Sequence, residues 1–139
     1  MPSFLGQDRG VIPFVKVDKG VAAEHDDVNL MKPMPELDAL LARAAKLRVF
    51  GTKMRSVIIP ASRSGIAAVV AQQFEVVAQI ATHGLLPIID SEVLVKSPDK
   101  ARAEAMLLEE LTRALDALPS SRQVMLKLTI QSGPIFTCR

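Results

Sequence analysis

An α/β fold built on a parallel sheet is the fold class that the sequence predicts, on two observations. Short apolar stretches typical of strands alternate with longer stretches of helical periodicity from residue 11 to residue 130. Four charged residues, Lys16, Lys53, Asp90 and Lys127, lie in these strands, each 37 positions after the one before. An unpaired buried charge destabilises a protein, so charges in buried strands need a reason. Their recurrence indicates β/α units that each place one polar group at a common site, as in the active centre of a barrel.

Coincidence or a solenoid could also produce this equal spacing. Loops and helices vary in length, so the identity of the three intervals can be a coincidence. A solenoid has a fixed period, but its repeats should resemble one another, and the segments between these residues do not. A barrel unit of about 31 residues, longer with insertions, fits the interval better.

The first half of the chain predicts two strands, each followed by a helix. Residues 11–17 form the first strand, and residues 36–48 form a helix with leucines on one face at helical spacing. Residues 51–59 form the second strand. The next helix covers residues 64–83 and ends at Gly84, which takes the left-handed conformation that closes a helix.

The second half continues the same alternation. Residues 85–94 form the third strand, and residues 123–130 form the fourth. Between them Ser97 and Pro98 supply an N-cap and a first-turn proline for a helix that extends to about Leu118. Strands and helices in this order give a parallel sheet with right-handed crossovers.

Each predicted strand has one apolar face and one face that carries charge. In the fourth strand Met125, Lys127 and Thr129 alternate with Leu126 and Leu128. We expect the apolar face to pack on helices and the mixed face to line a barrel interior. The same alternation puts six further residues on the mixed face: Lys16, Asp18, Lys53, Arg55, Asp90 and Glu92.

Composition narrows the class of protein. The 139 residues suffice for one domain, and a net charge of +2 does not favour a nucleic-acid or membrane partner. Cys138 is the single cysteine, so no intrachain disulfide is expected. The N-terminal sequence lacks the pattern of a secretory signal, and no apolar stretch is expected to span a bilayer. These features predict a cytoplasmic location.

The predicted cluster has the chemistry of amine catalysis. A lysine becomes nucleophilic when desolvation or a nearby cation lowers its pKa. Lys127 lies between two leucines, with Lys16 and Lys53 expected nearby, which suits attack on a carbonyl to form a Schiff base. Asp90 or Glu92 would move protons, and the spare cations suit an anionic substrate such as a sugar phosphate. The alternative is a set of buried salt bridges, Lys53–Asp90 and Arg55–Glu92.

Other polar residues favour structural roles. Two histidines, His25 and His83, are too few for the clustered ligands of a metal-dependent enzyme, so no metal site is predicted. Residues 25–27 are expected to form a solvated turn, and His83 suits a helix C-terminus. Residues 62–65 open a helix and could hold an anion, although the pattern favours ordinary capping.

Four segments together resemble a known family, the class I fructose-1,6-bisphosphate aldolases, in their shorter bacterial form. VIPFVKVDKG at 11–20 is similar to the family's Lys-Val-Asp-Lys-Gly strand, and GTKMRSVII at 51–59 to its Lys–x–Arg strand. PIIDSEV at 87–93 corresponds to its Glu-Pro-Glu strand, and VMLKLT at 124–129 to the strand with the Schiff-base lysine. The resemblance covers about residues 5–130, in the family's order.

The resemblance implies an (α/β)8 TIM barrel and the cleavage of fructose 1,6-bisphosphate to dihydroxyacetone phosphate and glyceraldehyde 3-phosphate, a step of glycolysis, without any cofactor. Lys127 matches the Schiff-base lysine, and Asp90 matches the glutamate with the main acid/base role. The further matches are Glu92 and Lys53 as catalytic residues and Lys16 and Arg55 as substrate-binding residues.

Three departures from the family's pattern lower the activity that we expect. Asp90 stands in place of glutamate, which moves its carboxylate about one methylene back. Ser91 replaces proline and is expected to loosen the turn. The segments match only about strands three to six, so residues 1–139 are expected to be one partial barrel domain, with a lead-in at 1–10 and a divergent tail at 131–139.

Two hypotheses therefore remain open. The first is an aldolase-type enzyme with Lys127 as its nucleophile. The second is a non-catalytic remnant of the barrel that acts only through association. A parallel sheet with open edges and an uncovered face promotes pairing with other chains, so we expect either self-association or a monomer of low stability.

Overall fold

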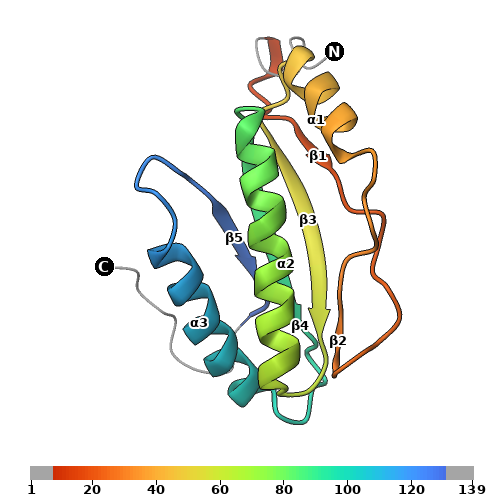
Figure 1. Cartoon of the computed structure of the whole chain (residues 1–139), viewed down its shortest axis with the longest axis vertical. Helices are drawn as coiled ribbons and strands as arrows, with labels where there is room; N and C mark the ends of the chain where they lie inside the picture. The colour runs from red at the N-terminus through yellow and green to blue at the C-terminus, as the bar shows by residue number, and fades with distance from the viewer. Residues whose placement is uncertain (1–7, 131–139) are drawn as a thin grey trace.

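Strands and helices alternate along residues 8–130, the part of the chain that the computed structural model describes (Figure 1). Residues 1–7 of the predicted lead-in and the whole predicted divergent tail at 131–139, with Cys138, lie outside these residues. In chain order the elements are β1 (Phe14–Lys16), β2 (Val28–Asn29), α1 (Leu37–Lys46), β3 (Gly51–Ile58), α2 (Arg63–Thr82), β4 (Leu86–Val93), α3 (Lys100–Asp116) and β5 (Met125–Leu128).

Four of the strands form a parallel sheet in the order β1-β3-β4-β5. The predicted α/β class with a parallel sheet is therefore confirmed. The strand register sets Lys16 beside Lys53, Arg55 beside Asp90, and Asp90 beside Lys127. Because paired residues of neighbouring strands point to the same face, the charged residues of these four strands share one face of the sheet.

The fifth strand, β2, is antiparallel and was not predicted. It pairs with the end of β3 through Val28–Ile58 and Asn29–Val57. Asp26 and Asp27, both with positive φ, form the turn that precedes it. The turn was expected at this place, but a strand of two residues is too short to produce a periodic pattern.

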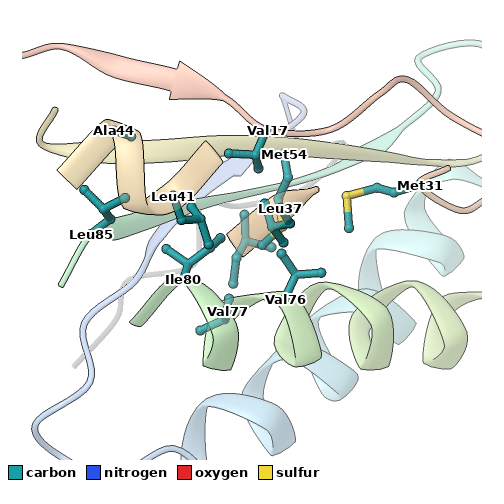
Figure 2. Packing of buried hydrophobic residues seen from close by; sticks show 11 residues of the cluster. Val17, Met31, Leu37, Leu41, Ala44, Met54, Val76, Val77, Ile80 and Leu85 are labelled. Atoms are coloured by element: carbon teal, nitrogen blue, oxygen red, sulfur yellow. The ribbon is translucent and has the colours of Figure 1, made fainter. Parts of the chain in front are cut away.

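The hydrophobic core lies between the helices and one face of the sheet, where Figure 2 shows side chains from α1, α2 and β3 in contact. Met54 of β3 and Leu41 of α1 are fully buried there. A second cluster joins α2 and α3 to Ile58 and Val93 on the same face. All three helices thus pack on the face opposite the charged residues.

The central helix α2 is long and apolar enough to span a membrane by length and composition alone, contrary to expectation. Much of its apolar surface, including Ile66, Val69 and Ile80, is buried between the sheet and the other helices. Its composition is therefore explained by its position at the centre of the core.

Two details of the second half differ from the prediction. Helix α3 begins at Lys100 with Asp99 as its N-cap residue, so Ser97 is not the cap, and the hydroxyl of Ser97 is buried without a hydrogen-bond partner among residues 8–130. Leu126 and Leu128, which were expected to pack on helices, are 38% and 39% exposed. Helix cover is therefore thin over the edge strand β5.

Candidate active site

Three side chains that the sequence singled out meet on the open face of the sheet. The Lys127 ammonium on β5 donates to Asp90 Oδ2 on β4 at 2.9 Å. Lys53 Nζ on β3 lies 3.1 Å from the same oxygen. The Asp90 side chain is 1% exposed, whereas those of Lys53 and Lys127 are 28% and 62% exposed. One buried carboxylate oxygen is thus shared by two amines that solvent can reach.

The neighbouring pair, Arg55 and Glu92, lies further along the same two strands. Arg55 Nη1 donates to Glu92 Oε2 at 3.1 Å, and both side chains are partly exposed. Both salt bridges of the alternative interpretation, Lys53–Asp90 and Arg55–Glu92, are therefore present. The carboxylate of Glu92 is engaged by Arg55, so the structure brings Asp90, and not Glu92, to the two amines.

Lys16 shares the face but has a different partner. Its ammonium lies 2.8 Å from Asp18 Oδ1 and also donates to the Asp18 carbonyl. Burial acts to raise the pKa of Asp18. The hydrogen bonds from Lys16 and from the backbone N–H of Gly20, with the charge of Lys16, outweigh this effect, so the pKa lies below its usual value. Lys16 is 59% exposed and remains accessible to an anion.

A residue that sequence reasoning missed holds the strand that carries Asp90. Gln73 of α2 is fully buried, donates from Nε2 to the Asp90 carbonyl at 3.1 Å, and accepts from the Ser91 hydroxyl at 2.6 Å. The expectation that Ser91 loosens a turn is wrong, because Ser91 lies within β4, where it is buried, hydrogen-bonded and paired on both sides, with Ser56 and Leu128. The sequence did contain a signal for Gln73, because it is a polar residue on the buried face of an otherwise apolar helix.

The possible anion site at residues 62–65 is a helix cap. Ser62 accepts from the N–H of Gly65 at 3.1 Å, and both Ser62 and Ser64 donate to the carboxylate of Asp26. These bonds, first from Ser64 and then from Ser62, lower the pKa of Asp26. A carboxylate of the chain already lies against this helix N-terminus, which is the position an anion would take.

The remaining candidates are accounted for by local contacts. His83 pairs with Asp38 of α1 at 3.2 Å, next to the left-handed Gly84 that ends α2 as predicted. Among residues 8–130 there is no group of three or more His, Cys, Asp and Glu residues that could hold a metal ion.

Comparisons with known proteins add little to this geometry. No family model matches the chain. Among solved structures, the arginine decarboxylase of Paramecium bursaria Chlorella virus superposes with a TM-score of 0.48 and 12% identity, over 85% of this chain and 33% of that chain. The chain thus spans about a third of that protein's length.

Proposed function

We propose that this chain carries the Schiff-base centre of a class I fructose-1,6-bisphosphate aldolase, with Lys127 as nucleophile. The observation on which the proposal rests is the Asp90 carboxylate, which contacts Lys127 at 2.9 Å and Lys53 at 3.1 Å through one oxygen. An amine that attacks a carbonyl needs an acid/base group within hydrogen-bond reach. Asp90 meets that requirement for either lysine. The parallel sheet would then be four strands of a TIM barrel.

The proposed reaction needs no group beyond these residues and water. The Lys127 amine adds to the ketone of the sugar phosphate, and the carbinolamine loses water to give an iminium ion. The iminium accepts the electron pair of the breaking carbon–carbon bond, which releases glyceraldehyde 3-phosphate and leaves an enamine. Asp90 removes the hydroxyl proton during cleavage and returns a proton to the enamine carbon. Hydrolysis then frees dihydroxyacetone phosphate and Lys127.

The charge of the face suits a phosphorylated substrate. When both amines are protonated, the single carboxylate of Asp90 leaves one positive charge in excess. Lys16 and Arg55 add two exposed cations on the same face, although each already has a carboxylate partner. Phosphate groups form charge-assisted hydrogen bonds with such side chains. We therefore assign Lys16 and Arg55 to substrate binding, and Lys53 and Glu92 to support of the proton transfers.

A second candidate function is a non-catalytic remnant that acts through association. The observation that favours it is the edge strand β5, whose four residues are all exposed and whose leucines lack full helix cover. Unpaired strand edges with apolar side chains promote pairing with another chain. In this alternative the ion pairs at Asp90 have only a structural role.

Reductive trapping separates the two candidates. The chain is incubated with dihydroxyacetone phosphate, reduced with borohydride, and mapped by mass spectrometry. The aldolase proposal requires an adduct at Lys127 that Lys127→Arg abolishes while the ion pair with Asp90 is retained. Labelling spread evenly over surface lysines, such as Lys32, Lys46 and Lys96, would contradict it and favour the remnant.

A further inference from the structure

The buried, helix-side face of β3 and β4 carries several polar side chains, of which Ser56 is level with Ser91 and Thr52 is level with Pro87. Gln73, Ser91, Thr52 and Ser56 are all fully buried at a position where helix and strand normally pack through apolar residues. The hydroxyls of Thr52 and Ser56 have no hydrogen-bond partner among residues 8–130. Buried polar groups reduce stability unless they are paired. Gln73 and Ser91 meet this condition by pairing with each other, and a buried polar pair that is satisfied in this way makes the local structure rigid.

The geometry points to Gln73 as a positioning residue for Asp90, an inference that rests on the proposed function. The amide of Gln73 binds two consecutive residues of β4: Nε2 donates to the backbone carbonyl of Asp90 at 3.1 Å, and Oε1 accepts from the side-chain hydroxyl of Ser91 at 2.6 Å. Asp90 and Ser91 point to opposite faces because they are consecutive strand residues. Gln73 thus holds the backbone from the helix side, while the carboxylate contacts both lysines on the other side.

Because Gln73 holds the backbone of Asp90, it also influences how the Asp90 carboxylate contacts the amines of Lys53 and Lys127. Asp90 Oδ2 must remain within hydrogen-bond reach of Lys53 on β3 and Lys127 on β5 at once. A small rotation or shift of the Asp90–Ser91 peptide would favour one lysine over the other. Displacements of about 1 Å are enough to reduce the rate of a positioned reaction about a hundredfold. Gln73 restricts this movement of the Asp90–Ser91 peptide and does not itself contact the substrate.

The test compares two glutamines that each hold a backbone segment. Gln73→Leu combined with Ser91→Ala replaces both partners of the Gln73–Ser91 hydrogen bond by apolar groups, a change that can be nearly neutral for stability. It also removes the donor to the Asp90 carbonyl, which is the contact under test. The matched control is Gln72→Leu. Gln72 is adjacent in α2, and its amide holds the N–H and carbonyl of Met31 at 2.9 and 3.0 Å, away from the lysines.

Two measurements are made on each variant. The first is the yield of borohydride-trapped dihydroxyacetone phosphate at Lys127, which should fall about ten- to a hundredfold in the double variant and stay unchanged in Gln72→Leu. The second is pulsed acetylation of Lys53 and Lys127 relative to the exposed Lys46. This ratio should rise about threefold or more in the double variant, because the carboxylate no longer holds both charged hydrogen bonds.

The outcomes distinguish failure of this inference from failure of the proposed function. If the double variant matches the unmodified chain in both measurements, or if Gln72→Leu changes them equally, Gln73 only stabilises the fold and the inference is wrong. If the unmodified chain forms no adduct at Lys127, the proposed function fails. The acetylation ratio then still decides whether Gln73 positions Asp90.

Discussion

Simultaneous removal of Lys53 and Lys127 should destabilise the protein by more than the sum of the two single removals. The reason is that both amines contact one oxygen of Asp90, whose side chain is 1% exposed. After either single substitution to methionine, the other lysine still pairs with the carboxylate. After both substitutions, a buried carboxylate has lost both of its cationic partners.

The expected magnitudes follow from the exposure of each partner. Lys127 is 62% exposed, so Lys127→Met should cost about 0.5 kcal/mol, as for a surface ion pair. Lys53 is 28% exposed, and Lys53→Met should cost about 1–1.5 kcal/mol, the value of one hydrogen bond to a charged group. The double substitution should cost about 3–5 kcal/mol, the range for a broken buried pair. The coupling between the two sites is then about 1–3 kcal/mol.

Urea unfolding at pH 7 measures each free energy, provided that the slope with denaturant is the same for all variants. Arg55→Met is the matched control, because Glu92 keeps 33% of its side chain in solvent and the loss should stay below about 1 kcal/mol. If the double substitution equals the sum of the singles within about 0.5 kcal/mol, the two lysines do not share Asp90, and the reasoning about the site is refuted.

Three further predictions concern other parts of the molecule. Ser62→Ala should lower the free energy of unfolding by about 1 kcal/mol because α2 loses its N-cap, and an unchanged thermal midpoint would contradict this. Asp18 has a folded pKa below its ordinary value of 3.8, so its stabilisation is present above that value and is lost as the pH falls through the lower folded pKa. The stability difference between the unmodified chain and Asp18→Asn should therefore shrink below about pH 4, and a difference that grows there would exclude this account. In the described part of the chain β1 and β5 are unpaired on their outer sides, which predicts self-association; a compact, cooperatively folding monomer in sedimentation at high concentration would count against it.

The parallel sheet and the meeting of Lys53, Asp90 and Lys127 could be predicted because they depend on strong local patterns. Alternation along β3 and β4 decides which side chains share a face, and parallel strands put equivalent positions at the same level. Lys16 was predicted in the same cluster. It shares the face, but its ammonium pairs with Asp18, which the alternation puts on the same face two residues later, and not with Asp90.

The elements that sequence reasoning missed depend on contacts between distant segments. Strand β2 exists because it pairs with the end of β3, and Gln73 acquires its partners only when α2 lies on β4. The start of α3 was placed too early, at Ser97, because the Ser-Pro signal for a helix N-terminus is local. The resemblance to aldolases assigned roles to side chains, and whether those roles apply here is a question for trapping at Lys127.

The thin cover of β5 has a dynamic consequence for the proposed nucleophile. Within residues 8–130 its ladder joins it to β4 alone, and all four of its residues are exposed. It therefore has the features of a segment that opens well below the free energy of global unfolding. Such an opening would carry Lys127 away from Asp90 while β3 leaves Lys53 in place. Amide hydrogen exchange should accordingly be faster at Leu126 and Leu128 than in β3. A covalent adduct that links Lys127 to a ligand held by the other cations would slow it.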